Sequence, residues 1–128
     1  MEFSGQYLTY REYTALGGTL AETPFNLLEF EARKEIDNRT YGRLKTIINQ
    51  RQEVKLCDNN LISLLKGYAE NNARDKGKLS ENTDGYSVTY AGVSAELTKT
   101  QKSEVKRIIE TYLGECKLEN GTPYLYRG

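Results

Sequence analysis

The sequence predicts a mainly α-helical protein, a small helical bundle with a β-hairpin inserted before the last long helix and an extended C-terminal tail. Three observations predict this fold class. Apolar residues recur at helical spacing in two long segments, residues 78–93 contain a strand-like alternation, and glycine and proline interrupt residues 115–128. A chain of 128 residues is long enough for one core. We therefore expect a single domain over 1–128, with the bundle over 1–114.

The composition argues against several function classes. The chain has 18 basic and 18 acidic side chains, a formal net charge of zero and no histidine. Without histidine, the usual serine and cysteine nucleophile pairs cannot form, and Cys57 and Cys116 are not at metal-ligand spacing. Apolar runs are too short for a membrane-spanning helix or a secretory signal. We therefore expect no enzymatic activity, no metal and no cofactor, in a protein made in a cytoplasm-like compartment.

The first helix is predicted over residues 10–16. Thr9 and Glu12 have the spacing of a capping box, in which each side chain accepts a hydrogen bond from the backbone of the other. The pair Gly17-Gly18 is expected to end this helix, because glycine readily adopts the conformation found after a helix C-terminus.

A second helix is predicted over about 23–38, because a threonine at the cap precedes a proline at the first helical position. Its apolar stripe consists of Phe25, Leu28, Ala32 and Ile36. Leu27 and Phe30 point to the other side of the helix. Either the first helix or the segment 44–48 covers these two residues within the monomer, or they form a subunit contact.

The central core helix is predicted over 50–72, where the apolar pattern is strongest. One face carries Val54, Cys57, Leu61, Leu64, Leu65, Tyr68 and Ala69, with Ile62 at its edge. Cys57 is interpreted as a small buried apolar residue. The polar run 58–60 lacks the ligand pattern of a calcium loop and is interpreted as the solvated flank of the helix.

The last long helix is predicted to begin near Thr98 or Thr100 and to end at Gly114. Its apolar stripe consists of Val105, Ile108, Ile109 and Tyr112. Because its stripe matches the one on the central helix, the two helices are expected to pack together.

Residues 78–93 are predicted to form the β-hairpin. Asp84-Gly85 supplies a tight turn, and Tyr86, Val88 and Tyr90 alternate with polar residues. An isolated two-stranded hairpin is only marginally stable, so it is expected to pack on helices or to be completed by another chain.

The C-terminal tail over 115–128 ends in an apolar, aromatic tip formed by Tyr124, Leu125 and Tyr126. Asn120-Gly121 and Pro123 prevent a helix there. Such a tip is expected to dock, either on its own domain or on a neighbouring protein.

The order and spacing of these motifs resemble the head-to-tail connector (adaptor) proteins of long-tailed bacteriophages and prophages of Gram-positive bacteria. The resemblance covers nearly the whole chain. It includes the segments YLTYREYTALGGTL, TPFNLLEFEARKEIDNRTYGRL, QEVKLCDNNLISLL, LSENTDGYSVTY and YLGECKLENGTPYLYRG. It implies a structural virion protein without catalysis or cofactor.

Members of that family form a head-completion ring of about twelve subunits beneath the portal vertex of the capsid. The resemblance therefore implies three partners: the portal protein, the next connector, stopper or tail-completion protein, and further copies of the chain. It also implies a location in the virion neck, after synthesis in the bacterial host cytoplasm, with no membrane association. DNA would pass through the channel without specific binding, which suits a chain of zero net charge.

Eight residues are predicted to contribute to subunit or portal interfaces. They are Tyr86, Val88, Tyr90, Tyr124, Leu125, Tyr126, Leu27 and Phe30. The alternative function is a small phage or prophage module that binds nucleic acid or regulates expression. For that function the candidate residues are Lys99, Lys102, Lys106 and Arg107, although Glu104 and Glu110 dilute their charge.

Overall fold

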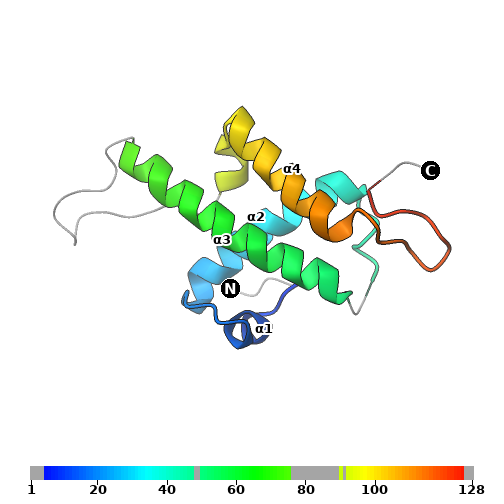
Figure 1. Ribbon diagram of the computed structural model, residues 1–128. Coiled ribbons are helices and arrows are strands. Elements are labelled where there is room, and N and C mark those ends of the chain that lie inside the picture. Colours follow the sequence, from blue (N-terminus) through cyan, green and yellow to red (C-terminus); the bar gives the residue numbers. More distant parts are fainter. Residues whose placement is uncertain (1–4, 48–49, 76–89, 91, 126–128) are drawn as a thin grey trace.

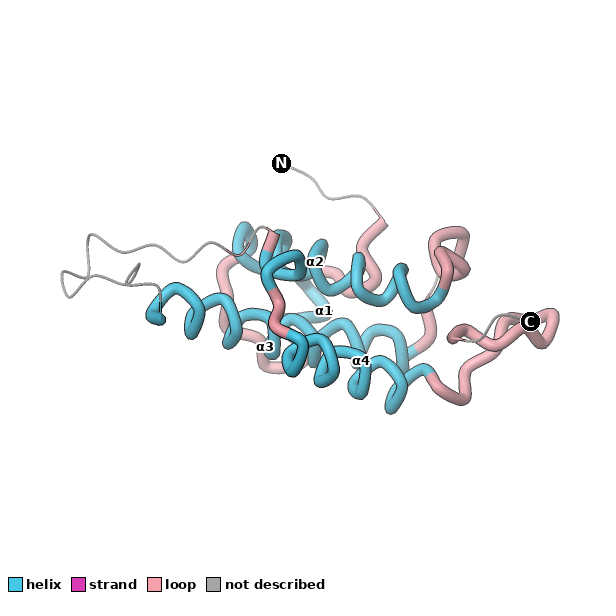
Figure 2. Tube along the Cα trace, turned by 90° about the horizontal axis from the view of Figure 1, so that it is seen from above, coloured by secondary structure: helices cyan, strands magenta, loops and turns pink. Residues whose placement is uncertain are grey.

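The computed structural model describes residues 5–47, 50–75, 90 and 92–125, and this part of the chain contains four α-helices and one 3-10 helix (Figure 1). The elements are α1 (Tyr10–Ala15), α2 (Glu22–Thr40), α3 (Gln52–Asp75), η1 (Val93–Glu96) and α4 (Lys99–Leu113). The predicted mainly α-helical class is therefore confirmed. The long helix α3 packs against both α2 and α4, and α1 packs against α2 (Figure 2).

Two helices begin with capping boxes, and the one at α1 is the one that the sequence predicted. At α1 the backbone N–H of Glu12 donates to the Thr9 hydroxyl over 3.1 Å, and the Thr9 N–H donates to the Glu12 carboxylate over 3.0 Å. A second capping box joins Thr98 to Gln101 at α4, over 2.9 and 3.1 Å. Both boxes satisfy backbone donors that have no acceptor inside the helix.

Helix α2 begins and ends at different residues from those predicted. It starts at Glu22, so Pro24 lies within the first turn instead of at its first position. Proline is tolerated there because the first-turn N–H groups have no intrahelical partner. The helix continues to Thr40, and Tyr41 then adopts the left-handed conformation, with φ 56°. This conformation is rare for a large side chain and ends the helix.

The core fills the spaces between α3 and its neighbours. Its largest fully buried side chains are Tyr124, Phe25, Leu8, Leu28, Ile36, Leu44, Leu61, Ile62, Leu65, Ile109, Leu113 and Glu29. Cys57 is fully buried, as predicted. The prediction of a solvated flank at 58–60 is wrong for Asp58, which is also fully buried. Because α2 and α4 pack on two sides of α3, its buried surface is wider than one apolar stripe.

The predicted β-hairpin at 78–93 is not supported. Most of it lies outside the described residues, which contain no strand. At its predicted C-terminal end, Val93 begins η1 and is buried. A tertiary contact holds this turn, since both the backbone N–H and the hydroxyl of Ser94 donate to the buried Glu31 carboxylate over 3.1 and 2.6 Å. Local alternation in the sequence does not reveal such an anchor.

Candidate interaction surfaces

The C-terminal segment folds back onto its own bundle. Tyr124 is only 2% exposed, and its backbone N–H donates to the Cys116 carbonyl over 3.0 Å. Between these residues a single antiparallel bridge joins Lys117 to Pro123. We call residues 116–124 the C-terminal loop. The sequence left open whether the aromatic tip docks on its own domain or on a neighbour, and the structure places Tyr124 in its own core.

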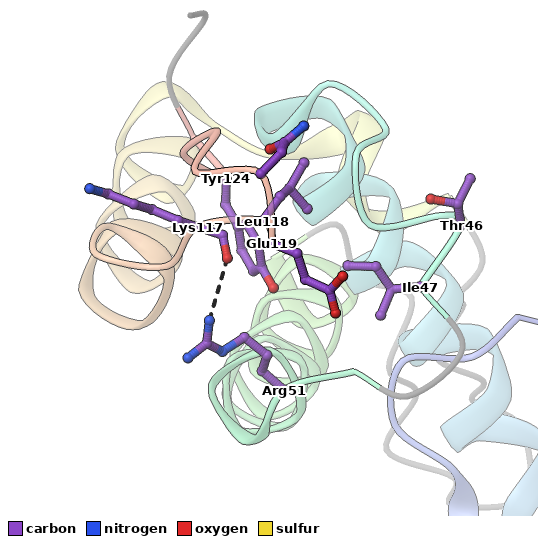
Figure 3. Close-up of a pocket in the computed structure, with 8 residues that line it drawn as sticks. Thr46, Ile47, Arg51, Lys117, Leu118, Glu119 and Tyr124 are labelled. Carbon is purple, nitrogen blue, oxygen red and sulfur yellow. Dashed lines mark hydrogen bonds between the residues drawn. The ribbon is translucent and has the colours of Figure 1, made fainter.

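Two arginines hold the C-terminal loop in place. One guanidinium nitrogen of Arg43 donates to the Pro123 carbonyl over 2.6 Å and to the Tyr124 carbonyl over 3.3 Å. Arg51 donates to the Lys117 carbonyl over 3.4 Å (Figure 3). Burial raises the pKa of the Tyr124 phenol, although the neighbouring Arg51 charge opposes the shift. The loop is therefore anchored by backbone contacts as well as by its aromatic side chain.

A groove of about 740 Å³ lies between the C-terminal loop and the connection from α2 to α3. Its lining residues are Thr46, Ile47, Arg51, Lys117, Leu118, Glu119, Asn120 and Tyr124. Figure 3 shows Glu119 of the loop and Ile47 of the facing connection pointing toward one another. Apolar side chains with a few charged groups around them suit a protein side chain or a short peptide segment.

A second surface is the outer face of α2, where two aromatic rings are exposed. Phe30 is 41% exposed and Tyr41 is 49% exposed. Phe30 lies near the middle of α2, and Tyr41 directly follows its last residue, Thr40. We call this the aromatic face of α2. Leu27, predicted on the same side, is partly exposed.

Cationic side chains surround both rings of the aromatic face. Arg33 and Lys34 lie 5.5 and 5.4 Å from the centre of the Phe30 ring, and Arg43 lies 5.0 Å from that of Tyr41. The proposed intramolecular cover for Phe30 is therefore incomplete. The segment 44–48 instead contributes Leu44 to the core. Tyr41 is not among the predicted interface residues, because its exposure and backbone conformation are set by the end of α2.

A third surface lies toward the C-terminal end of α3. The Tyr90 hydroxyl donates to Glu70 over 3.0 Å, and this tyrosine is partly buried against the core. Glu70 and Arg51 are 19 positions apart, or about 28 Å along a helix. Tyr90 and the C-terminal loop therefore lie toward opposite ends of α3.

The remaining predicted interface residues are distributed as follows. Leu125 is partly buried against the core. Tyr86, Val88 and Tyr126 lie outside the described residues. The structure thus places Leu27 and Phe30 on one surface. It places Tyr124 in the core and Leu125 against the core, and Tyr90 lies toward the other end of α3.

No family model, curated protein or solved structure matches this chain. Its chemistry is therefore inferred from the residues themselves. Within the described residues, no three metal-ligating side chains are grouped to hold an ion, and no helix is long and apolar enough to cross a membrane. Burial raises the pKa of both the Cys57 and Cys116 thiols, which makes them poor nucleophiles. The exposed aromatic and arginine groups instead suit contact with another macromolecule.

Proposed function

We propose that this protein is a structural assembly protein, a head-to-tail connector that joins the portal vertex of a phage capsid to the tail. The sequence motifs resemble those of that family across nearly the whole chain. The structural observation that supports the proposal most is the separation of different candidate surfaces along α3. The aromatic face of α2 exposes Phe30 and Tyr41, and a groove lies beside the C-terminal loop. Toward the other end of α3, the surface consists instead of Tyr90 hydrogen-bonded to Glu70.

Closed rings require such an asymmetric subunit. In a heterologous contact, one patch of each subunit meets a different patch of the next, and the ring closes when the rotation between subunits divides a full turn. The aromatic face of α2 has the composition of an interface centre, because aromatic and arginine side chains are enriched there. We assign Phe30 and Tyr41 to the contact between neighbouring subunits.

Native mass spectrometry tests this proposal on the full chain, alone and mixed with a phage portal protein. We expect a closed species of about twelve subunits, formed either alone or on the portal. Phe30→Ser should weaken assembly by about tenfold or more, since losing a contact worth about 1.4 kcal/mol changes affinity tenfold. Its melting temperature should change little, because Phe30 is exposed.

Leu16→Ser is the matched control. Leu16 is 48% exposed, similar to Phe30, but it lies at the end of α1. This variant should assemble like the wild type. A chain that stays monomeric both alone and with the portal protein would contradict the proposal, as would equal loss of assembly in the two variants.

A nucleic-acid-binding module is the second candidate, and one observation favours it. Lys99, Lys102, Lys106 and Arg107 are all exposed on α4. The sequence suggested that Glu104 dilutes their charge, but Glu104 accepts a hydrogen bond from the Tyr68 hydroxyl over 2.6 Å and is partly buried. The Glu104 carboxylate is therefore engaged with α3, whereas the four basic side chains are exposed to solvent.

A gel shift with duplex DNA at several salt concentrations tests this alternative. If α4 binds phosphates, replacing Lys102 and Lys106 by alanine should weaken binding. It should also reduce the slope of log affinity against log salt concentration by the contribution of about two phosphate contacts. Absence of a shift at low salt would exclude this candidate and leave the connector proposal unaffected.

A further inference from the structure

Two carboxyl side chains are buried together between α2 and α3. Glu29 of α2 and Asp58 of α3 are both fully buried, and neither Asp58 oxygen has a donor among the described side chains and backbone groups. Two ionised carboxylates can only accept hydrogen bonds, so they repel each other. A proton on one of them supplies a donor to the other. The hydrogen bond between Glu29 and Asp58 therefore requires a shared proton.

The surrounding groups identify Asp58 as the member that holds the proton. The Arg33 guanidinium lies 3.3 Å from Glu29, and the backbone N–H of Tyr7 donates to Glu29 over 3.1 Å. The backbone N–H of Leu8 also donates to Glu29. These three groups stabilise a negative charge on Glu29. Asp58 has no such donor, so its neutral form is favoured.

The other titratable groups near the pair leave no cation available for a second charge. Asp37 of α2 accepts a hydrogen bond from the Tyr7 hydroxyl, and its negative charge acts on Asp58. Burial and this hydrogen bond raise the pKa of the Tyr7 phenol, so it stays neutral. Cys57 is also neutral, because burial raises the pKa of its thiol. Arg33 is the cation that acts on both members of the pair.

Residues 5–9, here called the N-terminal arm, pass over this cluster. The Gln6 amide donates to the Asn26 side chain over 2.9 Å, and Tyr7 contributes both its backbone N–H and its hydroxyl to α2. Tyr7 is 4% exposed and Leu8 is fully buried. Polar contacts to α2 and the apolar packing of Tyr7 and Leu8 in the core therefore both hold the arm.

We propose that the N-terminal arm is a pH-responsive cover over the Glu29–Asp58 pair, closed while the carboxyls share a proton and opened when the proton is lost. A second buried charge requires water or a counter-ion. Opening the arm admits water to Glu29 at the cost of exposing Leu8, and it leaves the contact between α2 and α3 in place. Separating the two helices would instead expose the main core.

The direction of the response follows from the pKa shifts. Burial, and then the Glu29 charge, raise the pKa of Asp58 well above its ordinary range, and burial raises that of Glu29. A group with a raised folded-state pKa stabilises the closed state fully below its ordinary pKa of about 4. That stabilisation is lost as the pH rises through the folded-state value. The arm should therefore be closed in acid and open progressively in base.

Hydrogen exchange of the Tyr7 and Leu8 amides in the full chain tests this cover from about pH 5 to about pH 9. After correction for the intrinsic base dependence of exchange, we expect wild-type protection of these amides to fall by about tenfold or more as the pH rises. Asp58→Asn should remove this dependence, because its carboxamide donates permanently to Glu29. Glu53→Gln, an exposed change on the same helix, should behave like the wild type.

Glu29→Gln gives a second, independent test, which also serves if Asp58→Asn fails to fold. Its carboxamide can donate to an ionised Asp58, so this variant should likewise flatten the profile. Constant protection in the wild type would overturn the proposal. So would an unchanged pH dependence in a folded variant, or an equal loss of protection at Leu61 in the core, which would place the response in the whole bundle.

Discussion

Replacing Tyr124 by alanine tests whether the C-terminal loop belongs to the folded core. Tyr124 is 2% exposed, and truncating a fully buried aromatic side chain costs about 3–5 kcal/mol through lost transfer free energy and the cavity left behind. Domains of this size unfold with about 5–15 kcal/mol, so the change removes a large share of the stability. The melting temperature should fall by about 10 °C or more.

Leu125→Ala is the control, because Leu125 is next in sequence but only partly buried. Its expected cost is about 1 kcal/mol, in line with the smaller apolar area that it removes from water. Urea unfolding followed by circular dichroism measures both variants. The slope of the free energy against urea should match the wild type if the change acts on the folded core.

Wild-type stability in Tyr124→Ala would refute this reasoning. It would mean that the C-terminal loop is held loosely in solution and that Tyr124 is free to contact a partner. An equal loss in Tyr124→Ala and Leu125→Ala would also contradict it, because the two side chains differ in burial.

Two further predictions concern α4 and α1. Ile109→Ala should lower the free energy of unfolding by about 2–5 kcal/mol, and Ile108→Ala should lower it clearly less, because Ile109 is fully buried and Ile108 only partly. Similar urea midpoints for the two variants would contradict the assigned helix face. Burial opposes the shift at Glu12, but hydrogen bonds from Lys55 and Thr9 lower its pKa, so its stabilising effect is present above about pH 4.3 and is lost as the pH falls through the folded-state value. Glu12→Gln should therefore lower the melting temperature at neutral pH and match the wild type in acid, and a pH-independent difference would show that the charge has no role.

The sequence by itself determined the helical elements, because their signals are local. The capping boxes at Thr9 and Thr98 involve residues only three positions apart, and both are present in the structure. The apolar periodicity of α3 and α4 likewise predicted which helices pack together, with ends within a few residues of those observed. The start of α2 was predicted less well, because the helix begins at Glu22, before the predicted Thr23 cap, and its N-cap Ala21 makes no side-chain capping hydrogen bond.

Only the tertiary structure decided which side chains of the helices and of the C-terminal loop are buried and which stay exposed. Asp58 has a polar side chain in a polar run of the sequence. It is buried between α2 and α3, where it meets Glu29, which lies 29 positions earlier in the sequence. Tyr124 is placed by Arg43, 81 positions earlier. Phe30 stays exposed because no described element covers it fully. These outcomes depend on contacts between distant residues, which the periodicity and capping signals of a single segment do not contain.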